Sequence, residues 1–128
     1  RDGLVVPVIH NADRSSLMEI ARQRASLVQK ARSGSLEADD VTGGTFTITN
    51  LGMYPVDHFQ AIINAPQAAI LSIGRTRQEP VVADGAIVAR DVIGLGFTFD
   101  HRVGNGAEAG KFLALLVKRL TKPGIGQE

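Results

Sequence analysis

Phe99-Asp100-His101-Arg102-Val103-Gly104-Asn105-Gly106 is the stretch of sequence that decides the fold. An apolar run typical of a β-strand, residues 92–99, ends there, and a run with helical spacing, residues 107–120, starts there. The stretch therefore predicts a strand-to-helix junction that places a histidine, an acid, an arginine and an amide within six residues. Because such a tip is open while its scaffold is rigid, we expect His101 to be a reactive group.

The helix after the junction has clear start and stop signals. Asn105 followed by Glu108 is a capping pair, in which each side chain bonds a backbone N–H near the other residue. Asn105 is therefore an excellent helix N-cap whatever else it does. Pro123 and Gly124 predict the end of the helix, and residues 122–128 are expected to form a loose tail. The apolar face of this helix comprises Ala109, Phe112, Leu113, Leu116, Val117 and Leu120.

Upstream of the junction, three segments have strand patterns. Residues 68–73 form a buried apolar run, and residues 81–88 predict a hairpin with Asp84-Gly85 at its turn. Residues 45–50 alternate apolar and polar side chains, as a half-buried strand does. One face of that strand holds three hydroxyls, and such a face is typical of a solvent-exposed sheet surface. They belong to Thr45, Thr47 and Thr49.

The first part of the chain predicts a strand and a helix. Residues 4–9 form a compact apolar run suited to a buried strand. Ser16 followed by Glu19 predicts a capping box, and Gly34 is expected to end the helix that follows. The basic face of this helix is interpreted as a solvated surface. Its apolar face comprises Leu17, Ile20, Ala21, Leu27, Val28 and Ala31.

Roughly five strands and two long helices predict an α/β fold of the α+β type, with an antiparallel component in its mixed sheet. Gly94 and Gly96 share one face of their strand, so another segment is expected to pack closely there.

The apolar faces are large for 128 residues, so we expect apolar surface that only a further segment or a partner subunit covers. The chain starts at Arg1, almost directly on a strand, and is expected to be a piece of a longer polypeptide.

The composition excludes several kinds of function. Fourteen basic residues nearly cancel 13 acidic ones, and a net charge of +1 gives no electrostatic basis for binding nucleic acid or an anionic membrane. The absence of cysteine excludes disulfides, thiolate metal ligands and a cysteine nucleophile, and it is consistent with a reducing compartment. The longest apolar runs are far too short to span a membrane, and no signal peptide is visible.

Among candidate catalytic groups, His101 is the strongest. No Gly-x-Ser-x-Gly motif marks a serine nucleophile. The three histidines lack the spacing of metal ligands, so we expect no metal site. His10 ends a strand pattern and His58 follows an acid in a loop, and both are interpreted as structural. His101 alone follows an apolar strand directly and lies between an acid and an arginine.

The junction also resembles a known signature. Asp100-His101-Arg102-Val103-Gly104-Asn105-Gly106-Ala107 is similar to the Asp-His-Arg-x-x-Asp/Asn-Gly-Ala motif of dihydrolipoamide acyltransferases, the core components of 2-oxo acid dehydrogenase complexes. Residues 3–13, 43–53 and 61–71 resemble three further blocks of this family, in the same order. The resemblance implies that residues 1–128 are the C-terminal part of a single catalytic domain of the chloramphenicol acetyltransferase-like fold. The lipoyl and subunit-binding domains lie outside this part.

The resemblance implies an activity, and it assigns roles to residues. The family transfers an acyl group between dihydrolipoamide and coenzyme A, so these two are expected as substrates, with no tightly bound cofactor. His101 would be the general base, Thr49 would stabilise the oxyanion and Asn105 would support the site. Asp100, Arg102 and Asn50 are expected to bind substrate. Asn105 stands where aspartate is more usual and Thr49 where serine is common, and neither change removes the function.

The resemblance also implies partners and a location. A homotrimer is expected, with the histidine and the hydroxyl of each active site coming from different subunits, and trimers are expected to form a larger symmetric core. Decarboxylase and dihydrolipoamide dehydrogenase components would bind through domains outside this chain. The location implied is the bacterial cytoplasm or the mitochondrial matrix.

Two alternatives remain open from the sequence. One is a non-catalytic homologue that only builds the core, although such relatives tend to lose the histidine at the position of His101. The other is a chloramphenicol-type O-acetyltransferase, which shares the fold and the base. The blocks at residues 43–53 and 61–71 resemble the dihydrolipoamide enzymes more closely.

Overall fold

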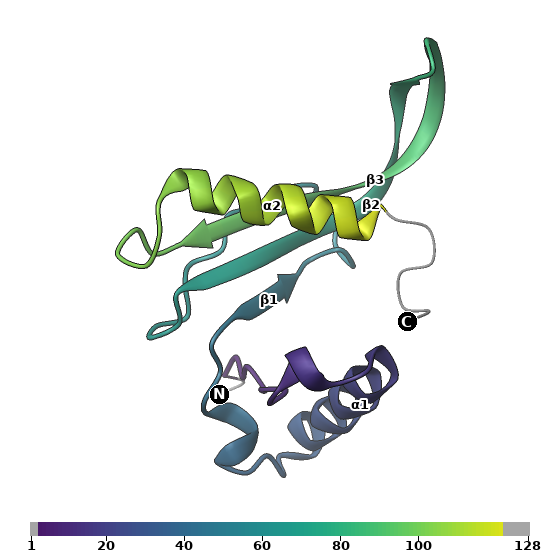
Figure 1. The fold of residues 1–128 in the computed structure, drawn as a ribbon. Helices are drawn as coiled ribbons and strands as arrows, with labels where there is room; N and C mark the ends of the chain where they lie inside the picture. Colours follow the sequence, from purple (N-terminus) through teal and green to yellow (C-terminus); the bar gives the residue numbers. More distant parts are fainter. Residues whose placement is uncertain (1–2, 122–128) are drawn as a thin grey trace. The chain divides into compact units, whose positions relative to one another are not determined.

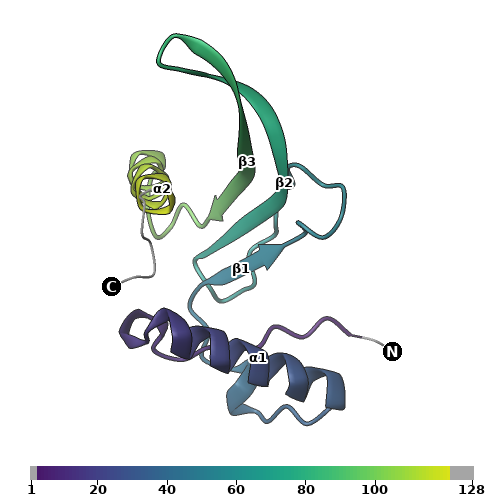
Figure 2. The ribbon, with the colours of Figure 1, turned by 90° about the vertical axis from the view of Figure 1, so that its right-hand side faces the viewer.

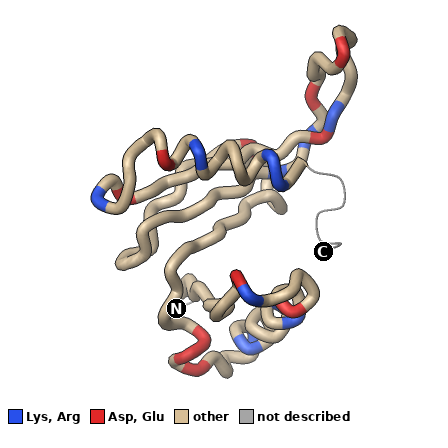
Figure 3. The backbone as a smooth tube through the Cα atoms, in the orientation of Figure 1, with Lys and Arg blue, Asp and Glu red and all other residues tan. Residues whose placement is uncertain are grey.

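The computed structural model describes residues 3–121. The chain divides into two compact units, with the boundary between Gly44 and Thr45. Both units contain basic and acidic residues (Figure 3). Among the described residues, no helix has the length and apolar character needed to cross a membrane.

The first unit contains one long helix, α1 (Leu17–Ser33), and two short 3-10 helices, η1 (Ala12–Arg14) and η2 (Asp39–Val41). The predicted capping box is confirmed, because the Ser16 hydroxyl accepts from the Glu19 N–H and the Glu19 carboxylate accepts from the Ser16 N–H at 2.7 Å. Gly34 ends the helix with a φ of 68°, as expected of a C-cap glycine.

The predicted strand over residues 4–9 is wrong, since the segment has no regular structure. Leu4 is 95% exposed, and the Val8 N–H donates to the Asp40 carbonyl at 2.8 Å. A strand needs a neighbouring strand to satisfy its N–H and C=O groups, and the described part of this unit contains no strand. The apolar sequence alone therefore does not make this segment a strand.

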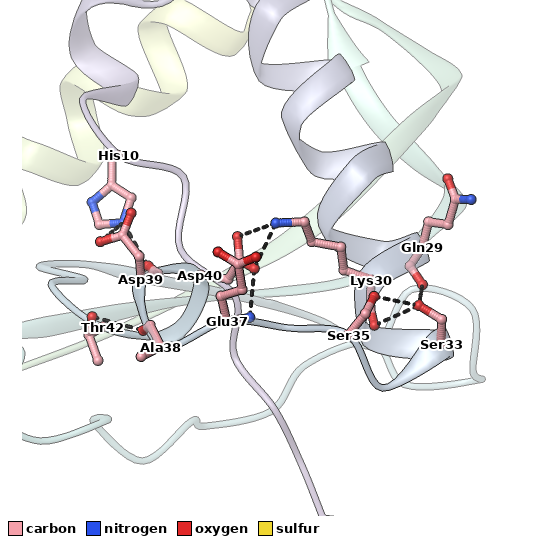
Figure 4. A network of polar contacts seen from close by, with 10 residues as sticks. All are labelled: His10, Gln29, Lys30, Ser33, Ser35, Glu37, Ala38, Asp39, Asp40 and Thr42. Atoms are coloured by element: carbon pink, nitrogen blue, oxygen red, sulfur yellow. Dashed lines mark hydrogen bonds and ion pairs between the residues drawn. The ribbon is translucent and has the colours of Figure 1, made fainter.

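Polar contacts hold the η2 segment to the end of α1 (Figure 4). The Lys30 ammonium donates to both carboxylate oxygens of Asp40, at 3.0 and 2.9 Å. The pKa of Asp40 is lowered. The largest cause is the hydrogen bond that its carboxylate accepts from the Glu37 backbone N–H, and the next is the hydrogen bond from Lys30. His10 donates from Nε2 to the Asp39 carbonyl at 3.0 Å, a structural contact of the kind expected for this histidine.

The second unit is a three-stranded mixed sheet with one helix (Figure 1). Its elements are β1 (Thr47–Asn50), β2 (Ala69–Ala83), β3 (Ala86–Phe99) and α2 (Gly106–Leu120). The strand order is β1-β2-β3, in which β1 is parallel to β2 and β2 is antiparallel to β3. The predicted α/β class is confirmed, while the expected strand count was too high. The predicted end of α2 at Pro123-Gly124 and the predicted tail lie outside the described residues.

The expected hairpin is confirmed, but it is much longer than residues 81–88. Asp84 and Gly85 form its turn with φ angles of 52° and 79°, the left-handed pair that suits a two-residue hairpin. The polar residues that follow Gly74 continue the antiparallel pairing of the two hairpin strands. In this part Arg77 pairs with Val92, and Glu79 pairs with Arg90. Two strands of 15 and 14 residues therefore replace several short ones, and the hairpin extends beyond β1 (Figures 1 and 2).

One face of the sheet, here called the aromatic face, packs against α2 along β3. Ile48, Leu71 and Phe97 are register partners across the three strands and share this face. The Phe97 ring lies 4.8 Å from that of Phe112 on α2, and Phe46 lies 6.1 Å from the same ring. Figure 2 shows α2 almost end-on beside β3. This packing fixes the helix that starts at the junction.

The opposite face, here called the small-residue face, carries the register partners Thr49, Ser72 and Gly96. The chain at Asp57–Phe59 lies directly on it. The Ser72 hydroxyl donates to the Phe59 carbonyl at 2.8 Å, and a Cβ at Gly94 would lie 2.4 Å from the Asp57 carbonyl oxygen. The close packing predicted from the glycines of β3 is therefore confirmed.

Burial along β1 is the reverse of what its composition indicates. Thr47 is only 6% exposed, whereas Ile48 is 63% exposed. Thr47 is buried on the small-residue face, where Gln67 accepts a hydrogen bond from its hydroxyl, while Thr49 is half-buried and Thr45 is exposed. Ile48 is one of many apolar side chains left in solvent, as expected from the large apolar faces. Others are Ile62, Val82, Ile87, Val103 and Leu115.

Candidate active site

His101 lies in a tight turn directly after β3. The turn is held because the Asp100 N–H donates to the Ala68 carbonyl at 2.8 Å and the Val103 N–H donates to the Asp100 carbonyl at 2.9 Å. The imidazole is exposed, and its ring lies 4.6 Å from that of Phe99 at a tilt of 45°. The backbone is therefore fixed on both sides while the ring nitrogens remain open to a substrate.

Asp100 and Arg102 brace this turn by pairing with each other. The Asp100 carboxylate accepts from the Arg102 backbone N–H at 2.9 Å and from its guanidinium at distances of 2.6 to 3.0 Å. The Arg102 guanidinium, and after it the Arg102 backbone N–H, lowers the pKa of Asp100 to about 2. The carboxylate is therefore ionised at neutral pH. The expected role of both residues in substrate binding stays a prediction.

Asn105 caps α2, as its position in the sequence predicts. Its Oδ1 accepts from the N–H groups of Ala107 and Glu108, at 2.9 and 3.2 Å, and the Glu108 carboxylate accepts from the Asn105 N–H at 2.8 Å. The carbonyl half of the side chain is therefore committed to the helix. Its amide N–H groups are the half that remains for another partner.

Thr49 lies on β1, an edge strand of the described sheet, where its side chain is on the small-residue face and is half-buried. Within residues 3–121, no hydrogen bond involves its hydroxyl, so that hydroxyl can donate to a substrate. The next residue, Asn50, uses its side-chain oxygen to accept from the Gly52 N–H at 2.6 Å, which closes the loop after β1. Its expected role in substrate binding is not tested by this contact.

The structure brings Asp100, His101, Arg102 and Asn105 together, but not Thr49. Thr49 is two strands from β3, and its register partner there, Gly96, is three residues before Phe99. From strand spacing and rise, the Cα atoms of Thr49 and Phe99 are about 14 Å apart. The Thr49 side chain is on the small-residue face, while the His101 ring packs against Phe99 on the aromatic face. One protomer therefore does not place both groups at one site.

Two features near the candidate residues have no signal in the sequence. Gln67 accepts a hydrogen bond from Thr47, a contact that spans 20 residues. His58 accepts one from Arg77 at 3.3 Å, consistent with a structural role for this histidine. Neither contact follows a local spacing rule, so only the fold reveals them.

Among the described residues, no group of three histidine, aspartate or glutamate side chains could hold a metal ion.

The mixed sheet and the helix that follows the His101 turn are found in solved structures of similar proteins. Residues 1–125 match the catalytic-domain model of the 2-oxoacid dehydrogenases acyltransferase family, and the chain belongs to this family. The predicted family is therefore confirmed.

Solved structures of similar proteins share the fold. The dihydrolipoamide acetyltransferase of Azotobacter vinelandii matches with a TM-score of 0.90 and 42% identity, over 94% of this chain and 50% of that one. The cubic core of a pyruvate dehydrogenase multienzyme complex matches with a TM-score of 0.84 and 43% identity, over 88% of this chain and 46% of that one.

Curated relatives are similar at the same level. The acetyltransferase component of the acetoin cleaving system of Bacillus subtilis is 42% identical over 95% of this chain and 31% of its own length. The dihydrolipoyllysine-residue acetyltransferase component of the pyruvate dehydrogenase complex of Staphylococcus aureus strain Mu50 is 43% identical over 94% of this chain and 28% of its own length. The chain thus spans less than a third of these curated relatives.

Proposed function

We propose that this chain forms part of an acyltransferase that moves an acyl group between dihydrolipoamide and coenzyme A, with His101 as the general base. The observation that carries the proposal is the exposed imidazole in a turn whose backbone is held on both sides. Family membership supports the reaction class, and the names of the relatives support an acyl carrier attached to lipoyllysine. Both substrates are thiols or thioesters, so the base must act on sulfur.

Residue spacing in one relative supports the same three groups. For the Azotobacter vinelandii enzyme, a serine, a histidine and an asparagine are named as having roles in the catalytic mechanism. In that enzyme the serine lies 52 positions before the histidine, and the asparagine lies four positions after it. Thr49, His101 and Asn105 have the same spacing in this chain. Threonine keeps the hydroxyl of serine, and the asparagine is unchanged.

The reaction follows from the chemistry of these groups. The imidazole at His101 removes the proton from the incoming thiol, since histidine is the side chain that most often serves as a general base near neutral pH. The thiolate attacks the carbonyl carbon of the thioester, and the Thr49 hydroxyl donates to the resulting oxyanion. Collapse of this intermediate breaks the old carbon–sulfur bond, and the departing thiolate takes the proton back from His101. No acyl-enzyme forms.

The site is proposed to form between two protomers, because one protomer holds Thr49 and His101 on opposite faces of its sheet. A homotrimer with three such sites, assembled into a larger symmetric core, would join these groups. The cubic core of a related complex supports this arrangement. The decarboxylase and dihydrolipoamide dehydrogenase partners, and the cytoplasmic or mitochondrial location, stay predictions.

The test is acyl exchange between coenzyme A and dihydrolipoamide, measured on the complete natural polypeptide in its assembled form. His101→Ala is expected to lower kcat by about 10²–10⁴-fold, which is the usual contribution of a general base. His58→Gln is the matched control, because His58 is also exposed in this unit and is expected to leave kcat unchanged. A wild-type rate for His101→Ala would exclude His101 as the base.

Two further results would favour the alternatives. An intact assembly of the unmodified protein without exchange activity would indicate a core-building protein without turnover. Faster transfer to a hydroxyl acceptor than to dihydrolipoamide would indicate an O-acetyltransferase.

A further inference from the structure

One buried hydrogen bond near the candidate site has no role in the reaction described above. The Thr47 hydroxyl donates to the Gln67 side-chain oxygen at 2.5 Å. Thr47 is among the most buried polar residues, with 6% of its surface exposed. A buried hydroxyl that loses its acceptor bears the full cost of desolvation, so this contact is one that the strand cannot easily give up.

Thr47 lies two residues before Thr49 on the same short strand. Alternate residues of a strand share a face, so both threonines project onto the small-residue face. Strand β1 has only four residues, and in the described part of the chain it pairs with β2 alone. Four residues paired on one side give the strand few hydrogen bonds to hold its position. The additional hydrogen bond from Thr47 to Gln67 therefore contributes substantially to the position of Thr49.

Gln67 is itself well placed to act as an anchor. Its backbone N–H donates to the Asn64 carbonyl at 3.0 Å, which closes the turn before β2. The following carbonyl, that of Ala68, accepts from the Asp100 N–H at 2.8 Å. The acceptor for Thr47 is therefore attached to the base of the long hairpin, the most extensively paired part of the sheet.

We propose that Gln67 is a positioning residue for the acyl transfer, which holds β1 through Thr47 and thereby fixes the Thr49 hydroxyl where the oxyanion forms. This inference rests on the proposed function. Gln67 touches neither substrate nor reacting atoms in this account. Gln67 affects the reaction only through the position of Thr49. Its effect on kcat should therefore disappear when the Thr49 hydroxyl is removed.

The experiment is a double-mutant cycle in the complete polypeptide, assembled as it occurs. Gln67→Met removes the acceptor and keeps the length of the side chain, while Gln67→Glu keeps an acceptor. Because a displacement of about 1 Å at a catalytic group can cost up to about 10²-fold in rate, Gln67→Met is expected to lower kcat about tenfold. KM for both thiols is expected to change less than about twofold, since substrate binding is not involved. Gln67→Glu is expected to recover most of the loss.

The second side of the cycle separates positioning from a general structural role. In a Thr49→Val background, Gln67→Met is expected to cause no further loss of kcat, because the donor that it positions is gone. An equal loss in both backgrounds, or no loss in the wild-type background, would overturn the proposal. If Gln67→Met does not assemble, Thr47→Val removes the same hydrogen bond with an isosteric side chain and takes its place in the cycle.

The cycle also distinguishes this inference from the proposed function. A wild-type kcat for Thr49→Val alone would remove Thr49 from the oxyanion role, and the inference would fall with it. A large loss for Thr49→Val with none for Gln67→Met would refute the positioning role of Gln67 and leave the proposed reaction intact.

Discussion

Thr49 and His101 lie on opposite faces of the same three-stranded sheet. Thr49 shares the small-residue face with its register partners, while the His101 ring packs against Phe99 on the aromatic face. Two strand spacings also separate them. A protomer arranged in this way can contribute a hydroxyl to one site and an imidazole to another. Under the proposed mechanism, assembly is a condition of catalysis and not only a means of stabilising the protein.

The cap of α2 predicts how Asn105 variants behave. Asn105→Ala removes the acceptor used by two backbone N–H groups, so it is expected to lower the free energy of unfolding by about 1 kcal/mol. Asn105→Asp keeps an acceptor oxygen and adds a negative charge at the helix N-terminus, so its stability is expected to equal or exceed that of the wild type. Urea unfolding of the two variants measures the difference. Equal destabilisation by both would show that the cap is not what Asn105 supplies.

The small-residue face predicts a contrast between two glycines. Gly94→Ala would place a Cβ 2.4 Å from the Asp57 carbonyl oxygen, so we expect a loss of about 1–3 kcal/mol as the backbone shifts. Gly110→Ala is the control, because a Cβ there meets nothing within 4 Å on the exposed side of α2. It is expected to stabilise the helix by about 0.5–1 kcal/mol. Opposite changes in the unfolding midpoint support this packing, and a neutral Gly94→Ala contradicts it.

The ion pair between Asp100 and Arg102 predicts that the stability of the protein depends on pH in the acid range. The pKa of Asp100 is lowered to about 2 by Arg102, against an ordinary value of about 3.9 in the unfolded chain. A depressed pKa contributes stability that is complete above about pH 4 and is lost as the pH falls towards 2. Arg102→Gln is expected to remove the larger part of this contribution, that of the guanidinium, and to keep the part that comes from the backbone N–H of residue 102. Stability should therefore change less between pH 4 and pH 2 than in the wild type. Denaturant unfolding across this range is the measurement, and identical pH profiles would show that the pair has no such role.

Local signals in the sequence predicted several parts of the structure. Both capping boxes, the Asp84-Gly85 turn and the close packing at Gly94 each depend on a few neighbouring residues. These signals act within one turn or one strand, so they need no knowledge of the rest of the fold. The turn around His101 could be located for the same reason, since it lies between the end of a strand and the start of a helix.

Contacts between distant segments were not predictable. The burial of Thr47 and the exposure of Ile48 reverse the pattern of β1, and the partner of the buried Thr47 hydroxyl, Gln67, lies 20 residues away in the sequence. The apolar residues 4–9 have no strand beside them in their unit, so their composition was misleading. The full length of the long hairpin was not predicted, because the polar residues after Gly74 lack the apolar pattern of a strand. They are in a strand because their backbone groups pair with β3, which does not require a buried face.

The central claim is that His101 of one protomer acts with Thr49 of another, and the direct measurement is acyl exchange in mixed assemblies. His101→Ala and Thr49→Val proteins are first shown to be nearly inactive alone, then dissociated together and reassembled at equal amounts. If each site joins two protomers, about a quarter of the sites regain both groups, and about a quarter of wild-type activity is expected. Mixed assemblies that remain as inactive as either variant alone would contradict the account.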